Sequence, residues 1–274
     1  MGRSHRMRFR PLVLIPLVVS SLCVVMLVRM SLDDWRYVFP TAAVVAMAVL
    51  PAWLARRRIR RVLIAGDVHG VLRAWQPTMD RVPHPETMAP LMIATAYASY
   101  GWLDAARNAL SRAVKGPAWE AAREQRLFIE TLLLTFEGER ETALEKVREL
   151  ERLPLPARGV LVQRRVKQVR QGMAALVRAF GHESDAADRK RLERAASASP
   201  IVHWAMRYAE AIVAFDHGER DRARSLIEAA PDWPAPSRAF TQSSWVCSRR
   251  ASVVSRLGPT EDRRGQVGNT RVTR

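Results

Sequence analysis

Hydrophobic residues gather in two long uncharged runs near the start of the chain, and a helical periodicity follows them. The runs cover residues 11–28 and 37–54, and each is about as long as a helix that crosses the hydrocarbon core of a bilayer. A short polar linker at 29–36 separates them. We therefore expect residues 1–61 to form a membrane anchor in which two transmembrane helices pack as a hairpin.

Arginines flank both runs, before the first and directly after the second. Lys and Arg concentrate on the cytoplasmic side of membrane proteins. We therefore expect an integral protein of a cytoplasmic or bacterial inner membrane, with both termini in the cytoplasm. The arginines after the second run are expected to contact anionic lipid headgroups: Arg56, Arg57, Arg58, Arg60 and Arg61.

From residue 62 to 235 the pattern is helical. From about residue 85 to 235 the chain is rich in Ala, Leu, Arg and Glu and lacks the alternating β-branched runs that mark strands. Glycines at 101, 138, 181 and 218 interrupt it at spacings of 37, 43 and 37, and alanine follows each glycine five residues later. Gly permits the positive φ that ends a helix, and we expect the small alanine to let the next helix pack closely. The sequence predicts an all-α fold of repeated helix–turn–helix units.

These units resemble the tetratricopeptide repeat (TPR), a helix–turn–helix repeat of about 34 residues. In the unit at Gly101 the matching packing positions and the final proline are Ala94, Tyr97, Ala106, Leu110, Ala113 and Pro117. The unit at Gly181 departs from the pattern, because Lys190 stands at an apolar position. The resemblance implies a TPR-like α-solenoid. A pair of spans ahead of such repeats is similar to bacterial inner-membrane proteins of the HemY type.

In the TPR-like frame, the first helix of each unit lines the inner face of the solenoid. Inner faces of this kind bind an extended peptide or a partner helix. We expect the following residues there, either as partner-binding side chains or as ordinary core: Thr95, Ser99, Phe128, Leu132, Phe136, Tyr208 and Ile212.

Residues 66–70, Gly-Asp-Val-His-Gly, admit two interpretations. They resemble the first metal-binding box of the metallophosphoesterases, in which Asp67 and His69 would ligate a metal ion. They also begin 35 residues before Gly101, where the repeat frame predicts the turn of a first, degenerate unit. We favour helix, turn and helix, with Asp67 capping the second helix. A β-strand at 62–65 would contradict this prediction.

A two-metal phosphoesterase needs further carboxylate, Asn and His ligands. The nearest candidate, at 184–190, holds Asp185, Asp188 and Arg189 without the flanking glycines, and Thr270 stands where a last box would need His. The other histidines form no ligand pattern. We therefore expect no catalytic residue, no metal and no cofactor, and a protein that is not an enzyme.

The formal net charge of +17 lies mainly at the two ends of the chain. Residues 1–61 carry +9 and residues 236–274 carry +6, which leaves +2 for residues 62–235. The tail at 236–274 is rich in Ser, Thr, Gly and Arg and is expected to be disordered. Because it holds no groove-reading motif, nucleic-acid binding is a secondary interpretation.

The combined pattern predicts a membrane-anchored cytoplasmic scaffold whose TPR-like domain, residues 62–235, binds another protein. The alternatives are a membrane-bound metallophosphoesterase that uses the Gly-Asp-Val-His-Gly box and a membrane-tethered nucleic-acid-binding protein.

The stretch Val160–Gly172 alternates basic and apolar residues. It is either a solvated helix face or a surface for anionic lipid or an acidic partner.

Overall fold

The structure is a computed structural model, and it divides into two compact units at the junction between Arg61 and Val62. It describes residues 26, 29, 38–157, 159–234 and 236–241. The elements within these ranges are α-helices and one short 3-10 helix, and these ranges contain no strand. The predicted all-α class is therefore confirmed for the described part of the chain.

The first described helix is α2 (Val38–Ile64), which carries most of the segment predicted as the second span. Its large apolar side chains are exposed at Phe39, Met47, Val49, Leu50, Trp53 and Leu54. Among the residues that the structure describes, no helix is both long enough and apolar enough to cross a membrane. The segment predicted as the first span, 11–28, lies outside the described residues except for Met26.

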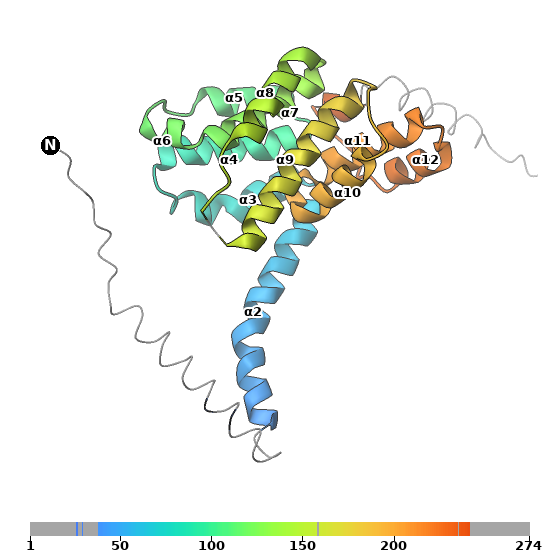
Figure 1. Cartoon of the computed structure of the whole chain (residues 1–274). Helices are drawn as coiled ribbons and strands as arrows, with labels where there is room; N and C mark the ends of the chain where they lie inside the picture. Colours follow the sequence, from blue (N-terminus) through green and yellow to red (C-terminus); the bar gives the residue numbers. More distant parts are fainter. Residues whose placement is uncertain (1–25, 27–28, 30–37, 158, 235, 242–274) are drawn as a thin grey trace, which may run out of the picture. The chain divides into compact units, whose positions relative to one another are not determined.

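Unit 2 begins with the last turn of α2 and is built from helices joined by short connections (Figure 1). Within it, α4 packs on α5, α7 on α8, α9 on α10 and α11 on α12. The helices are α3 (Val68–Met79), α4 (Pro85–Ser99), α5 (Leu103–Ser111), α6 (Pro117–Ala121), α7 (Arg123–Glu137), α8 (Arg140–Arg152), α9 (Val160–Phe180), α10 (Asp188–Ala198), η2 (Pro200–Val202), α11 (His203–Asp216), α12 (Arg220–Glu228) and α13 (Arg238–Thr241).

Left-handed glycines connect α2 to α3 and connect the helices of three of these pairs. Gly66, Gly101, Gly138 and Gly218 have φ values of 77°, 76°, 86° and 81°. After Gly101, Gly138 and Gly218, the next N–H donates back to the carbonyl five residues earlier, at N···O distances of 3.0, 2.9 and 2.8 Å. This bond satisfies a carbonyl that the end of the helix leaves without a partner, and it is the hallmark of the Schellman motif. The predicted turn positions at these glycines are confirmed.

The pair α9–α10 differs from the prediction in two ways. The left-handed residue is His182, with φ of 56°, whereas Gly181 is right-handed, so the turn falls one residue later than predicted. Ala186, expected at a packing position, is exposed. The close approach lies elsewhere, because a Cβ added to Gly172 would lie 2.2 Å from the Cβ of Ala195. The small residues that allow this pair to pack are therefore inside the two helices.

The first helices of the pairs form a row that returns to its start. In this row α4 contacts α7, α7 contacts α9, and α9 contacts α11. The indole Nε1 of Trp204 in α11 then donates to the carbonyl of Ile64 at 2.8 Å, and the hydroxyl of Tyr100 donates to the carbonyl of Leu63 at 2.6 Å. The last helix pair is thereby joined to the first, and the inner side of the row is enclosed.

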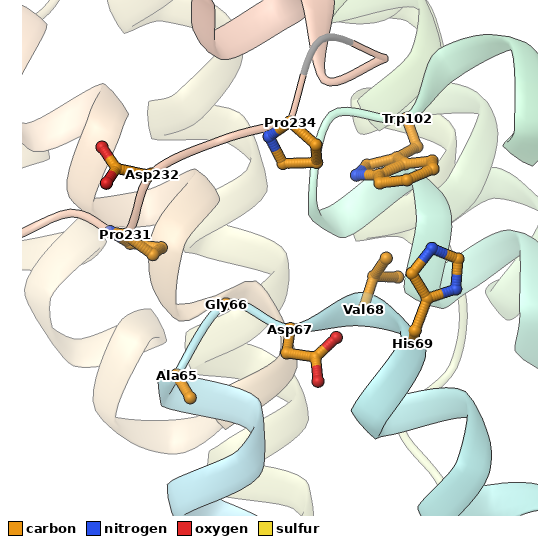
Figure 2. Close-up of a pocket in the computed structure, with 9 residues that line it drawn as sticks. All are labelled: Ala65, Gly66, Asp67, Val68, His69, Trp102, Pro231, Asp232 and Pro234. Atoms are coloured by element: carbon orange, nitrogen blue, oxygen red, sulfur yellow. The ribbon is translucent and has the colours of Figure 1, made fainter.

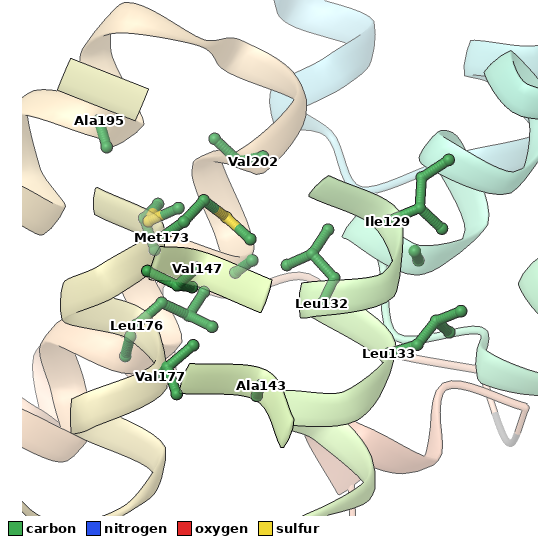
Figure 3. Close-up of a cluster of buried hydrophobic side chains, with 14 of the residues drawn as sticks. Ile129, Leu132, Leu133, Ala143, Val147, Met173, Leu176, Val177, Ala195 and Val202 are labelled. Carbon is green, nitrogen blue, oxygen red and sulfur yellow. The ribbon is translucent and has the colours of Figure 1, made fainter. Parts of the chain in front are cut away.

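The main core lies between the helices of this row and their partners (Figure 3). The side chains of α7 and α9 meet there, with Leu132, Met173 and Leu176 fully buried. Alanines at the predicted packing positions are also buried, at Ala106, Ala143 and Ala223. Small side chains at these positions let helices approach closely enough for larger side chains to fill the remaining space.

The packed part of unit 2 extends beyond residue 235, where the sequence predicted the start of a disordered tail. Residues 238–241 form α13, and Phe240 is 1 % exposed. Phe240 belongs to the main core cluster. The described part of the tail therefore contains a packed aromatic side chain, which the polar composition of 236–274 did not indicate. The remainder of the tail, 242–274, lies outside the described residues.

The contact between α9 and α10 can be tested by substitution. Gly172→Ala should lower the free energy of unfolding by about 1–3 kcal/mol, because the added methyl group overlaps Ala195 and the helices must separate. Gly116→Ala is the matched control. Nothing lies within 4 Å of its added Cβ, so it should change stability by less than about 0.5 kcal/mol. Urea unfolding followed by circular dichroism measures the free energy of unfolding of both variants. An equal loss of stability in the two would contradict the close approach of α9 and α10.

Candidate functional site

The Gly-Asp-Val-His-Gly sequence forms the turn between α2 and α3. Residues 62–64 are the last turn of α2, Gly66 is left-handed, and α3 begins at Val68. The predicted helix, turn and helix are therefore confirmed here. Asp67 occupies the N-cap position of α3, but its side chain makes no capping hydrogen bond and instead lies 3.7 Å from Arg73, so the expected cap is not formed.

A cavity of about 240 Å³ adjoins this turn (Figure 2). One wall is the turn itself, and the other is the segment that follows α12. The imidazole of His69 lies edge-on to the indole of Trp102, with 5.2 Å between ring centroids. The lining residues are Ala65, Gly66, Asp67, Val68, His69, Trp102, Pro231, Asp232 and Pro234.

The cavity does not have the arrangement that a metal ion requires. Figure 2 shows the Asp67 carboxylate and the His69 ring extending in different directions from the turn, with Asp232 on the opposite wall. No group of three or more His, Cys, Asp or Glu residues that could hold a metal occurs in the described ranges. A phosphoesterase centre needs several such ligands around two ions.

The second predicted metal-binding fragment, at 184–190, is part of an ion-pair network. Asp188 is fully buried, and both of its oxygens accept hydrogen bonds from Arg178, at 2.8 and 2.6 Å. Arg191 donates to the same carboxylate at 2.8 Å. Burial raises the pKa of Asp188, but these hydrogen bonds outweigh it and hold the pKa below its usual range. Asp188 therefore ties α9 to α10 and is not positioned as a metal ligand.

The residues predicted to line an open groove lie mostly inside the protein. Ser99, Leu132, Tyr208 and Ile212 are buried, and Thr95, Phe128 and Phe136 are half-buried. The C-terminal segment covers part of them, because Phe240 lies against Phe136 and Tyr208. Of the two roles that the sequence left open for them, the core role fits their burial.

The covering segment is 231–241, of which the structure describes residues 231–234 and 236–241, and these lie on a cluster of aromatic rings that we call the aromatic trough. The trough consists of Tyr100, Phe136, Trp204 and Tyr208, together with Gly101, which lies against the Phe240 ring. Phe240 stacks against Tyr208 at 4.6 Å and meets Phe136 at 5.2 Å between ring centroids. The Tyr208 hydroxyl also donates to the carbonyl of Phe240 at 3.3 Å.

Trp233 is the second anchor of this segment. Its ring centroid lies 6.2 Å from Tyr100, 6.3 Å from Trp204 and 6.1 Å from Tyr208. Sequence reasoning missed both anchors, because it placed one at the edge of the repeats and the other in the tail. A usable signal was present, since a Trp and a Phe among prolines in "PDWPAPSRAF" are unusual in a solvated linker.

Exposed apolar side chains gather at the start of α9, which we call the α9 tip. Val160 is 79 % and Leu161 is 75 % exposed, with Leu155 and Val162 beside them in the sequence and also exposed. Exposed cationic side chains follow on the same helix at Arg164, Arg165 and Lys167. The tip falls within the stretch Val160–Gly172 that the sequence singled out. Several large apolar side chains exposed in one short stretch are a candidate for a binding site.

The arginines predicted to contact lipid headgroups lie in the C-terminal half of α2. The side chains of Arg57, Arg58, Arg60 and Arg61 are exposed, and the side chain of Arg56 is outside the described set. Arg57 also lies over the ring of Trp53, 5.1 Å from its centroid.

No known protein family, curated protein or solved structure matches the chain.

The role of Asp188 gives a prediction that depends on pH. Asp188→Asn should lower the free energy of unfolding by about 2–4 kcal/mol at pH 7, because two arginines lose their buried partner. The wild-type carboxylate has a lowered pKa, so its stabilising effect is complete above the unfolded pKa of about 4 and is lost as the pH falls through the folded value. The difference between variant and wild type should therefore be constant from pH 8 to 5 and shrink below about pH 4.

Glu149→Gln is the control for this measurement. Glu149 pairs with Arg123 at the surface, where an ion pair contributes less than about 1 kcal/mol. Chemical unfolding of both variants across the pH range separates the two cases. If Asp188→Asn cost no more than Glu149→Gln, Asp188 would not be a structural anchor.

Proposed function

We propose that this protein is a membrane-anchored scaffold whose TPR-like helical domain binds another protein on its cytoplasmic side. The α9 tip is the observation that carries the proposal. Its apolar side chains are large, exposed and adjacent, and a binding partner would remove them from water at a gain of roughly 25 cal/mol for each Å² buried. The nearby cations would add preference for a partner with acidic residues around an apolar contact.

The proposed TPR-like character has support in the local geometry. Helix pairs reverse direction at left-handed residues near the spacing that the repeat predicts, and consecutive first helices lie against one another. Stacked helix pairs of this kind present surface on which partners bind in many repeat proteins.

Membrane anchoring is the other half of the proposal. It rests on the two uncharged runs at 11–28 and 37–54 and on the arginines that follow them. The exposed apolar side chains along α2 support it, because they would otherwise face water. Anionic headgroups would attract Arg57, Arg58, Arg60 and Arg61, at about 1 kcal/mol for each residue near the surface.

We propose a non-enzymatic role, since the Gly-Asp-Val-His-Gly turn is explained as a connection between helices. Asp67→Asn provides the direct check of the phosphoesterase alternative. Hydrolysis of an aryl phosphate in the presence of Mn²⁺ that disappears in this variant would overturn the scaffold-only proposal.

The α9 tip makes a prediction about partner capture. In native membranes, cross-linking followed by purification should recover a specific protein with the wild-type chain, and the double variant Val160→Asp and Leu161→Asp should reduce its recovery about tenfold or more. Because both side chains are exposed, the variant should keep its stability within about 0.5 kcal/mol.

Val114→Asp is the matched control, because Val114 is a similar side chain, 52 % exposed, at a different place in unit 2. It should leave recovery unchanged. Equal loss with Val114→Asp would indicate a non-specific effect of added charge. Unchanged recovery with the double variant would remove the α9 tip as the binding surface. Recovery of nucleic acid in place of protein would favour the nucleic-acid alternative.

Membrane anchoring has its own test. After cell lysis, the full chain should remain in the membrane pellet when the pellet is washed with alkaline carbonate, because two spans would hold it in the bilayer. A peripheral protein held by its arginines would be released by the same wash or by high salt, since salt screens charge attraction. Release by carbonate would contradict the two spans.

A further inference from the structure

The segment Pro231–Thr241 seals the aromatic trough as a bound peptide would. We propose that the trough is a peptide-binding groove and that this segment is its built-in ligand, which a partner segment of the same chemistry must displace. That chemistry is prolines around a Trp, with a Phe seven residues after the Trp. The inference rests on the proposed function in one respect, that the competitor is a segment of a partner protein.

The segment sits on two of the turn glycines. A Cβ added to Gly66 would lie 2.3 Å from Cγ of Pro231, and a Cβ added to Gly101 would lie 2.7 Å from Cδ2 of Phe240. At Gly138 and Gly218, by contrast, nothing lies within 4 Å of the added Cβ. The turns at Gly66 and Gly101 therefore form two seats for ligand side chains, one for a proline and one for a phenyl ring.

Between the seats the segment is anchored by aromatic side chains. The Trp233 and Phe240 rings lie 4.6 Å apart and together reach Tyr100, Phe136, Trp204 and Tyr208. Large rings near the centre of a contact supply most of the binding energy in peptide complexes. Prolines at 231, 234 and 236 limit the conformations of the free segment, so it loses little entropy when it binds. Both properties are those of a linear recognition motif.

The fit of the segment is incomplete, and this makes it displaceable. The indole Nε1 of Trp233 is buried without a hydrogen-bond partner among the described residues, as is the hydroxyl of Ser99. The indole of Trp204 is fully satisfied by comparison, because its Nε1 donates to Ile64. A buried donor without an acceptor weakens the bound state relative to the released state. A partner segment whose own anchor ring leaves no buried donor unsatisfied would bind more tightly than the chain's own segment.

A peptide added in trans tests the proposal. A fluorescently labelled peptide with the sequence of residues 231–241 should bind the full-length Phe240→Ala variant at least tenfold more tightly than it binds the wild-type chain, because its Phe can enter the vacated seat. Fluorescence anisotropy measures both affinities. The same peptide with Ala at the position of Phe240 is the control and should bind neither chain. Equal binding to both chains, or binding to neither, overturns the proposal.

Hydrogen exchange of the wild-type chain gives a second test that needs no variant of Phe240. The amides of Ser237 and Phe240 donate within the segment, to Pro234 and Ser237, so they report its opening. They should exchange at least tenfold faster than the amides of α11, since the segment detaches while the helices stay folded. Exchange of the segment only together with α11 would show that it is part of the cooperative core, and that result also overturns the proposal.

Two glycine variants separate release of the segment from backbone strain. Gly101→Ala places a methyl group in the seat of Phe240, whereas Gly138→Ala imposes a similar φ strain where nothing lies nearby. Exchange at 237–241 should rise about tenfold in the first variant and stay unchanged in the second, and an equal rise in both would count against the seat. None of these measurements uses a cellular partner. If these measurements failed, the proposal for the trough would be wrong. The cross-linking experiment at the α9 tip would still test the proposed function independently.

Discussion

The left-handed backbone of the turn residues is the constraint on which unit 2 depends. A helix that ends in a Schellman motif reverses within two residues, so the next helix must lie against the one before it. Gly101, Gly138, His182 and Gly218 each provide this reversal. Without it, the buried alanines would not face the preceding helix, and the row of first helices could not form.

The turns were predictable because their causes are local. A glycine, polar neighbours and an alanine five residues later are visible in one short stretch, and they placed the turns at Gly101, Gly138 and Gly218 correctly. The turn at Gly66 was placed by its spacing of 35 residues from Gly101. At Gly181 the same pattern was misleading, because His182 also tolerates positive φ and takes the turn position. Local patterns therefore identify that a turn occurs more reliably than they identify which of two adjacent residues makes it.

The enclosure of the inner face was not predictable, because its causes are distant in sequence. The bond from Trp204 to Ile64 joins residues 140 positions apart, and Tyr100 reaches Leu63 across 37 positions. An open solenoid and a closed row have the same helix-turn pattern, and they differ only in such contacts. For the same reason the sequence left two roles open for Tyr208 and Ile212, partner-binding side chains or core, and it did not identify Trp233 and Phe240 as the groups that cover the trough. Burial of Tyr100 raises the pKa of its hydroxyl. The hydroxyl therefore keeps its proton and donates a hydrogen bond to the carbonyl of Leu63.

The four turn glycines carry unequal constraints, and this has a consequence for how the sequence can change over time. At Gly138 and Gly218 only the backbone angle matters, so Asn, which tolerates the left-handed region, is an acceptable replacement there. At Gly66 and Gly101 any side chain would also collide with Pro231 or Phe240. Related chains that keep the covering segment must therefore retain both glycines, whereas chains that have lost it are free to vary at both positions together. Covariation of Gly66 and Gly101 with the covering segment would therefore show, from related sequences alone, whether the trough is occupied.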